Sequence, residues 1–482
     1  MITVDDLSLQ YSGAPLFSKV NLQFTPGNCY GIIGANGAGK STFLKILSGQ
    51  LEPSTGSVYI DPKARMSVLK QDQTMYDAYT VMDTVIMGNQ RLYDCGKEKD
   101  AIYAKDEMTD EDGIRASELE EEFADLGGWE AESDASRILQ GLGVAPEHHE
   151  TMMSDMDPRL KVKVLLAQAL FGHPDIILLD EPTNNLDLAS VVWLEDFLMD
   201  YDGTVLVVSH DRYFLDRVVT KVVEIFQHQG YVYQGNYTEF AKKKAKIRED
   251  LLKQYYNQQR EIKHQEEVIA KLKSFNREKS IKRAESREKM LDKIERLEKP
   301  TDENTDIHIV LEPDVTSGND VLTVEHLRKA FGTHTLFDDL SFEIKRGERV
   351  ALIGNNGTGK TTILKIINEL LLADGGTIVL GSNVHIGYYD QEHQLLHMEK
   401  TIFEEIADDY PQLNHTKIRN VLAAFLFTND DVFKRIADLS GGERGRVSLA
   451  KLMLSDANFL ILDEPTNHLD ITSKEILESA LN

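Results

Sequence analysis

Hydrophobic and polar residues follow several different periods along the chain, and each period predicts a different kind of element. Residues 1–25 alternate polar and apolar positions around turn signals, as expected of short strands. Two uninterrupted apolar runs, Tyr30–Ile33 and Ile176–Leu179, are typical of buried strands in a parallel sheet. Between residues 241 and 300, apolar residues recur at three-, four- and seven-residue steps, which predicts two packed helices. The chain is therefore expected to combine an α/β fold with a helical hairpin.

The first apolar run leads directly into a glycine-rich segment, residues 34–42, and then into a helical pattern. The segment has the form G-x-x-x-x-G-K-[ST]. Its glycines allow successive backbone N–H groups to face a phosphate, and the helix N-terminus adds a partial positive charge. Lys40 is expected to reach the β- and γ-phosphates of a nucleoside triphosphate, and Ser41 to ligate Mg²⁺. A glycine-rich turn without a ligand is the alternative.

The same pattern occurs a second time, which argues against that alternative. Residues 354–362 repeat it after the run Val350–Ile353, for which a strand is expected. The residues predicted to contact a nucleoside triphosphate in these two segments are Gly34, Ala35, Asn36, Gly37, Ala38, Gly39, Lys40, Ser41 and Thr42, and Gly354, Asn355, Asn356, Gly357, Thr358, Gly359, Lys360, Thr361 and Thr362.

The two segments belong to two copies of a longer unit. Pairing Lys40 with Lys360 fixes an offset of 320 residues, whereas the acidic pairs further along match at an offset of 283. The first copy thus carries 37 extra residues, which we assign to an acidic helical insertion at about residues 92–135. A solvated helical face is the simpler interpretation of this insertion, and an arm that contacts a partner is the alternative.

Paired acids end a buried apolar run in each copy. Asp180-Glu181 follows the first run, and Asp463-Glu464 follows its counterpart. Because ligands bind beyond the carboxyl ends of parallel strands, these acids are expected beside the phosphates. The first acid of each pair would hold Mg²⁺, directly or through water, and the second would orient or deprotonate the attacking water. His210 ends a further apolar run and is a candidate sensor of the γ-phosphate.

Tyr11 and Phe331 occupy matching positions upstream of the two glycine-rich segments. Either ring could stack on adenine, and for either residue alone a place in the core is the alternative. The pairing favours stacking.

The predicted helical hairpin differs in charge from the rest of the chain. The whole chain has a net charge of −27, which taken alone argues against nucleic-acid binding, but residues 241–300 hold 19 Lys and Arg against 11 Asp and Glu. A first helix of roughly 30 residues would hold a basic tip about 45 Å from its base, where it could reach a polyanion. A solvated spacer is the alternative. The seam is expected at Ile247, Leu251, Tyr255, Ile262, Ile269, Leu291, Ile294 and Leu297, and contacts to a polyanion at Lys271, Lys273, Arg277, Lys279, Lys282 and Arg283.

Length and composition limit the number of domains and the classes of protein to which the chain can belong. At 482 residues, the chain is expected to form two or three domains. It has only two cysteines and no apolar run near the ~18 residues that a membrane span needs. We therefore expect a cytoplasmic protein without structural disulfides.

These motifs, in this order, resemble the ATP-binding cassette (ABC) ATPase domains. The resemblance rests on the glycine-rich segments, the later glutamines Gln71 and Gln391, the signature Leu439–Glu443, the acidic pairs and His210. The duplication, the repeated Glu-Pro-Thr-Asn and the charged linker resemble the ABC-F family, specifically its YbiT-like branch.

The resemblance implies two P-loop ABC cassettes joined by a helical hairpin linker. The expected domains are residues 1–240, the linker 241–300, a connecting segment 301–320 and a second cassette 321–482. It also implies ATP and Mg²⁺ as ligands, with Thr361 as the counterpart of Ser41. In such proteins the cassettes form an intramolecular dimer, in which Ser440, Gly441 and Gly442 would complete the γ-phosphate site of the first cassette.

The resemblance further implies a ribosome-associated translation factor whose linker reaches rRNA and tRNA, without a membrane subunit. Contacts to phosphates would then give salt-sensitive affinity without sequence readout. Two other functions stay open at this stage. One is a binding module in which ATP-driven closure alone positions the linker, and the other is the fused motor of a membrane transporter.

Two positions depart from the family pattern. At the offset of 283, Asp157-Pro158 aligns with Ser440-Gly441, so the first signature loses a backbone N–H and gains a charge that phosphate disfavours. The spacing that leads to His210 would place the second histidine at 493, so we expect the second cassette to be incomplete. The first composite site is therefore expected to perform most of the hydrolysis.

Overall fold

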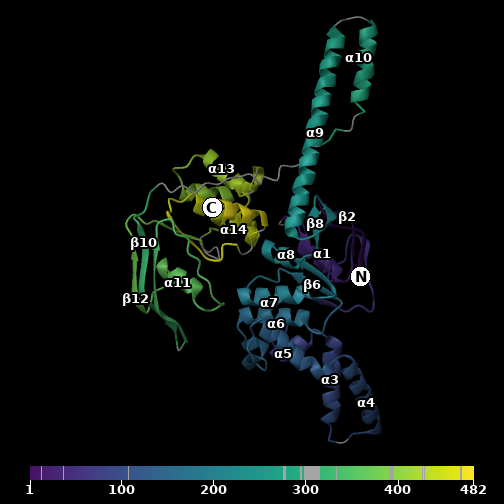
Figure 1. Ribbon diagram of the computed structural model, residues 1–482, viewed down its shortest axis with the longest axis vertical. Helices are drawn as coiled ribbons and strands as arrows, with labels where there is room; N and C mark the ends of the chain where they lie inside the picture. Colours follow the sequence, from purple (N-terminus) through teal and green to yellow (C-terminus); the bar gives the residue numbers. More distant parts are fainter. Residues whose placement is uncertain are drawn as a thin grey trace.

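The computed structural model describes residues 1–11, 14–35, 37–106, 108–274, 278–293, 296–297, 315–332, 334–389, 396–425, 427, 429–466, 469 and 471–481. It contains two α/β units, here called the first and second cassettes, which lie side by side (Figure 1). A long helical hairpin projects from the first cassette at one end of the molecule, and a shorter pair of helices projects at the other end (Figure 1).

The first cassette is built on a six-stranded, mainly parallel sheet, as the apolar runs predicted. Only β9 runs antiparallel, beside β8. In spatial order its strands are β5 (Met66–Val68), β6 (Ile176–Asp180), β7 (Thr204–Val208), β3 (Asn28–Ile33), β8 (Lys221–Phe226) and β9 (Gln229–Gln234). A three-stranded antiparallel sheet covers one side, in the order β2 (Ala14–Phe24), β1 (Ile2–Tyr11) and β4 (Thr55–Ile60).

Two apolar clusters hold this cassette together, one on each face of the large sheet. One cluster joins the two sheets to α1, and its rings include Phe17 and Phe43, whose centroids lie 5.9 Å apart at nearly right angles. The other cluster packs the remaining helices on the opposite face. The helices of the cassette body are α1 (Lys40–Leu47), α2 (Val81–Ile86), α5 (Ala131–Gly141), α6 (Pro158–Leu170), α7 (Leu188–Met199) and α8 (Arg212–Val218), with short 3₁₀ turns at Gly128–Glu130, Pro146–His148 and Met153–Asp155.

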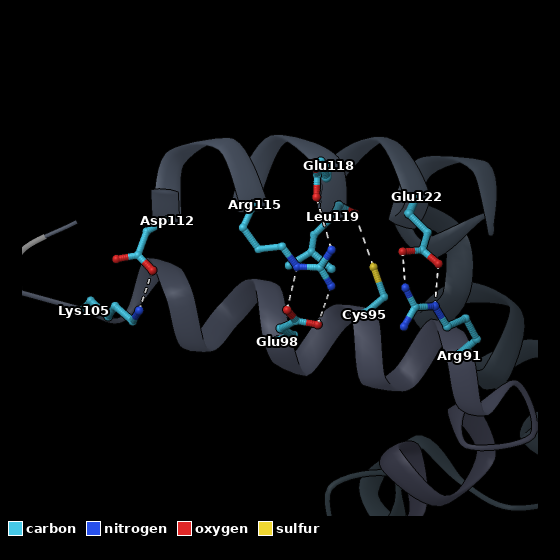
Figure 2. Close-up of polar contacts among 9 residues, drawn as sticks. All are labelled: Arg91, Cys95, Glu98, Lys105, Asp112, Arg115, Glu118, Leu119 and Glu122. Carbon is cyan, nitrogen blue, oxygen red and sulfur yellow. Dashed lines mark hydrogen bonds and ion pairs between the residues drawn. The ribbon is translucent and has the colours of Figure 1, made fainter. Parts of the chain in front are cut away.

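The extra residues of the first copy form a helical arm, α3 (Gln90–Tyr103) and α4 (Asp110–Asp125). Figure 2 shows the ion pairs that join the two helices, between Arg91 and Glu122 and between Arg115 and Glu98, and a third pair between Lys105, which follows α3, and Asp112 of α4. Beneath them lies a small apolar cluster, made of Cys95, Ile102, Ala116, Leu119 and the partly buried Phe123. The arm ends earlier than the expected residue 135, because α5 packs into the main core.

The hairpin consists of α9 (Tyr237–Ser274) and α10 (Glu278–Leu291). Its first helix has 38 residues rather than roughly 30, which corresponds to about 57 Å. Ile262 and Ile269 are buried, as the seam predicted, and so is Ala284 of α10. The seam was wrong at Ile247 and Leu251, which are 48% and 46% exposed, because α10 packs only along the distal part of α9.

The second cassette repeats the antiparallel sheet of the first, in the order β11 (His334–Lys345), β10 (Asp320–Phe331) and β12 (Gly375–Leu380). The duplication extends to backbone detail, because Asp6 and His326, at the offset of 320, both have positive φ angles, of 48° and 51°. The other elements are the parallel pair β13 (Ile386–Tyr389) and β14 (Phe459–Leu462), helices α11 (Lys360–Ile367), α12 (Ile402–Asp409), α13 (His415–Ala424), α14 (Gly441–Met453) and α15 (Ile471–Leu481), and 3₁₀ turns at Asn429–Phe433 and Ile436–Asp438.

The strand expected at Val350–Ile353 is absent from the described residues, although the glycine-rich segment follows it as predicted. In the first cassette the corresponding strand, β3, lies between β7 and β8 and bonds to both. Among the described residues of the second cassette, no strand occupies either flanking place. Without a ladder the apolar run is left open, and Ile353 is 82% exposed.

Candidate nucleotide site

The phosphate-binding loop of the first cassette connects β3 to α1. Gly39 caps α1 with a φ angle of 92°, a left-handed conformation that glycine adopts without strain. A Cβ atom there would also lie 2.6 Å from the side chain of Leu16. The Lys40 side chain is buried and donates hydrogen bonds to the carbonyls of Gly34, at 2.9 Å, and Ala35, at 3.1 Å. The loop therefore places the Lys40 ammonium beside the N-terminus of α1.

The acid that ends β6 lies beside this loop. Gln71 donates from Nε2 to Asp180 Oδ2 at 3.0 Å, so the predicted glutamine and the predicted metal ligand are in contact. The other oxygen, Asp180 Oδ1, is buried and has no hydrogen-bond partner among the described residues. Ser41 and Asp180 line the same pocket. A buried carboxylate oxygen near a hydroxyl fits a hard cation such as Mg²⁺.

Glu181 lies at the turn that follows β6, in contact with the segment around His210. The backbone N–H of His210 donates to Glu181 Oε2 at 3.4 Å, and His210 Nε2 lies 3.6 Å from Glu181 Oε1. Burial, and secondarily the charge of Asp180, raises the pKa of Glu181 to about 7. A carboxylate with such a pKa is suited to accept a proton near neutral pH.

The backbone is strained at the second acid of each pair, Glu181 and Glu464. Glu181 and Glu464 have φ angles of 51° and 46°, in the left-handed region that costs a non-glycine residue about 1–3 kcal/mol. Such strain is common at catalytic positions, and it occurs here at the same place in both copies. The sequence pattern gives no signal for it.

The opposite wall of the site comes from the second cassette. A cavity of about 500 Å³ is lined from the first cassette by the glycine-rich loop, the acids and His210, and from the second by Ser440, Gly441 and Gly442. Ser440 caps α14, where its hydroxyl accepts from the Glu443 N–H at 3.3 Å. A Cβ atom on Gly441 would meet only open space. Of the residues predicted for the first composite site, the cavity thus brings together Lys40, Ser41, Asp180, Glu181, His210, Ser440, Gly441 and Gly442.

The residues predicted for the second site match the first site at the lysine and differ from it at the two acids. Lys360 donates to the carbonyls of Gly354 and Asn355, at 2.7 and 2.9 Å, in the same way as Lys40. The predicted metal ligands are in direct contact, because Thr361 Oγ1 donates to Asp463 Oδ1 at 3.1 Å. Glu464, in contrast to Glu181, is exposed.

The degraded first signature keeps a structural role. Asp157 caps α6 and accepts from the Arg159 N–H at 2.8 Å, in the position where Ser440 caps α14. Pro158 is the first residue of that helix, where a missing N–H costs the helix nothing. The substitutions therefore preserve the helix start while removing a donor that a phosphate would use.

Other predicted residues lie apart from the cavity or outside the described residues. The Phe331 ring is 52% exposed, with the Lys329 ammonium 5.2 Å from its centroid. Lys271, Lys273, Lys282 and Arg283 are exposed on the distal half of the hairpin. Outside the description lie Asn36, Arg277, Gln391 and Ile294, and the side chains of Tyr11 and Lys279.

Five residues that line the cavity were missed from the sequence: Leu16, Asn184, Val208, Leu469 and Lys474. Only Lys474 leaves a sequence signal, because the offset of 283 pairs it with Val191, an apolar residue. In the part of the chain that the structure describes, no helix is long and apolar enough to cross a membrane.

Comparison with known proteins identifies the family. A family model described as ABC transporter matches residues 17–184 and 337–467, and a second with the same description matches residues 223–309. The probable ATP-binding protein YbiT of Escherichia coli is 41% identical over the whole chain and 91% of its own length. ABC transporter F family member 2 of Arabidopsis thaliana is 32% identical over the whole chain and 72% of its length.

A further relative has a name that states a process. The energy-dependent translational throttle protein EttA of Mycobacterium tuberculosis is 35% identical over 97% of this chain and 84% of its own length. The similarities cover both cassettes and the linker together, as the duplicated motifs predicted. This chain therefore belongs to the ABC-F family of ATP-binding cassette proteins, and it is an ATPase.

Proposed function

We propose that this ATPase binds the ribosome while ATP holds its cassettes together, and that hydrolysis in the first composite site ends the bound state. One observation carries the proposal: a single cavity combines the glycine-rich loop and acids of the first cassette with the signature of the second. Because neither cassette alone supplies all of these groups, nucleotide in the cavity would favour the closed arrangement.

The residues that line the cavity would have different roles in hydrolysis. Lys40 would face the β- and γ-phosphates, while Ser41 and Asp180 would hold Mg²⁺, which neutralises phosphate charge when bound. Glu181 would accept a proton from the attacking water, with His210 beside it. Across the cavity, the Ser440 hydroxyl and the N–H groups of Gly441 and Gly442 would bind the γ-phosphate oxygens, where negative charge develops.

The hairpin supplies the surface for the ribosome. Its tip carries exposed Lys and Arg residues at the far end of a helix of about 57 Å, while the chain as a whole is strongly acidic. Such a tip would contact rRNA or tRNA phosphates and keep the acidic cassettes away from them. The relative EttA, an energy-dependent translational throttle protein, supports translation as the process. The protein would then act in the cytoplasm, where translation takes place.

A double variant, Glu181→Gln/Glu464→Gln, tests this proposal by sedimentation with ribosomes. The amides keep the shape of the acids but lose the base, so ATP should remain bound and the variant should sediment with ribosomes in ATP but not in ADP. Equal sedimentation in both nucleotides would contradict ATP-dependent binding. If ribosomes leave the turnover of the parent chain unchanged, the alternative of a binding module with uncoupled turnover is favoured.

A further inference from the structure

Helix α15 of the second cassette contacts the first cassette at the segment that follows β7. Lys474, in the first turn of α15, donates from Nζ to the backbone carbonyl of His210 at 2.9 Å. One turn later, Glu478 forms an ion pair with Arg212. Two contacts between cassettes thus fall on three consecutive residues of the first cassette, and the first of these residues is the candidate γ-phosphate sensor.

The two contacts differ in their relation to the nucleotide. Lys474 lines the same cavity as Lys40, Glu181 and His210, whereas Glu478 and Arg212 do not line it. The side chains of Glu478 and Arg212 are 40% and 32% exposed, as expected of a surface ion pair of small energy. Of these two contacts, the one made by Lys474 therefore also borders the nucleotide cavity.

Lys474 binds the backbone carbonyl of the residue whose N–H and ring both lie beside Glu181. The N–H of His210 donates to one oxygen of Glu181, and its ring nitrogen Nε2 lies 3.6 Å from the other. On the far side of the same residue, the Asp211 N–H donates to the Ser209 hydroxyl at 3.1 Å. An ammonium on the His210 carbonyl thus limits rotation of the segment that flanks the predicted base.

We propose that Lys474 is a positioning residue, supplied by the second cassette, that holds His210 in place beside Glu181 when the cassettes are closed. This inference rests on hydrolysis at the first composite site. It makes the geometry of that site depend on the docking of α15, separately from the phosphate contacts that α14 would supply. At the offset of 283 the first cassette carries Val191 instead, which has no cation to offer the second site.

Three variants of the full chain test the role of Lys474. Lys474→Met keeps the length of the side chain but removes the donor, and Lys474→Arg restores a cationic donor. Glu478→Gln is the matched control, because it weakens the other contact of the same helix without touching the cavity. Each variant is compared with the parent by single-turnover hydrolysis, by the affinity for a non-hydrolysable ATP analogue, and by thermal unfolding.

The expected result separates catalysis from binding. Lys474→Met should slow the chemical step at least about tenfold, since small misplacements of catalytic groups cost up to about a hundredfold. Its affinity for the analogue should stay within about twofold, Lys474→Arg should recover most of the rate, and Glu478→Gln should keep it. Equal losses of the single-turnover rate in Lys474→Met and Glu478→Gln would show that both residues only hold the cassettes together, and would overturn the inference. A loss of analogue affinity at unchanged rate would show a phosphate ligand and overturn it too.

A parallel variant distinguishes failure of this inference from failure of the site assignment. If Lys40→Ala abolishes turnover while Lys474→Met leaves it intact, only the positioning role of Lys474 is contradicted. If Lys40→Ala keeps the parental rate, hydrolysis does not occur in the first site, and both statements fall. Thermal unfolding of Lys474→Met at the parental temperature shows that its loss of rate does not come from misfolding.

Discussion

Asn356, in the glycine-rich loop of the second cassette, donates from its side-chain amide to the backbone carbonyl of Asn185 in the first cassette, at 2.9 Å. Asn185 belongs to the loop that follows the acids Asp180 and Glu181, and it has a left-handed φ angle of 64°. The phosphate-binding loop of one cassette thus contacts the loop that carries the catalytic candidates of the other. ATP bound by the second cassette would stabilise this contact even where it is not hydrolysed.

This contact predicts an asymmetric response to loss of the two lysines. Lys40→Ala should remove most hydrolysis, and Ser440→Arg should do the same by filling the cavity from the other side. Removal of a single donor to developing charge typically costs about 10²–10³ in rate. Lys360→Ala should act mainly by weakening closure, so high ATP concentration should restore much of the rate.

Single-turnover assays on these three variants decide the assignment. Equal loss of turnover in Lys360→Ala and Lys40→Ala, with ATP still bound and the first site closed, would contradict the asymmetric assignment.

The two acids Glu181 and Glu464 should also differ in their effects. Glu181→Gln should bind nucleotide normally and lose most phosphate release, because the base has been removed from an enclosed site. Glu464→Gln should lose less, since Glu464 is exposed and would face a signature without its serine and glycine. Equilibrium dialysis measures binding and a phosphate-release assay measures turnover. Parental turnover in the double variant would show that neither acid is catalytic.

The parts of the candidate site that could be predicted from the sequence are those that depend on short stretches of chain. The loop around Lys40, the acid Asp180 and the signature at Ser440 each depend on a short stretch of backbone, so the sequence predicts both their conformation and their chemistry. The structure confirms the strands of the first cassette, the loop-to-helix turn at both glycine-rich segments and the hairpin, but not the strand at Val350–Ile353. It also brings Gln71 to Asp180 and Ser440 to the first site.

The features that were missed depend on partners far away in the chain. The run Val350–Ile353 has the composition of a buried strand, but a strand needs neighbours that a local pattern does not supply. Ile247 follows the helical period, yet only the end of α10 decides where α9 is covered. In the same way Lys474 shows its relation to His210 only when the cassettes are placed together.

The basic tip of the hairpin predicts salt-dependent binding to RNA. The triple variant Lys271→Glu/Lys282→Glu/Arg283→Glu should lower ribosome affinity and leave ATP binding intact. Each lost phosphate contact should also flatten the slope of log affinity against log salt by about 0.7–0.9. Lys242→Glu/Lys246→Glu/Lys253→Glu is the matched control, because it makes the same change in charge at exposed positions near the base of α9. If both triple variants lose affinity equally, net charge explains the binding and the tip contact does not.

The helical arm α3–α4 should be held together by its small apolar cluster more than by its ion pairs. The pairs in Figure 2 are largely exposed, and such pairs contribute about 0–1 kcal/mol each. Leu119, by contrast, is fully buried between the two helices. Leu119→Ala should therefore destabilise the arm by about 2–5 kcal/mol, whereas Glu118→Ala, which loses only an exposed contact to Arg115, should cost less than about 1 kcal/mol.

Hydrogen exchange on the intact chain measures this difference. In Leu119→Ala, the amides of α3 and α4 should exchange faster, while those of β6 and β7 keep the parental rate, because the arm cluster is separate from the cassette cores. ATP turnover without ribosomes should not change, since the arm does not line the nucleotide cavity. A uniform increase of exchange across the first cassette would mean that the arm is part of the cassette's cooperative core, and would contradict the prediction that the arm opens on its own.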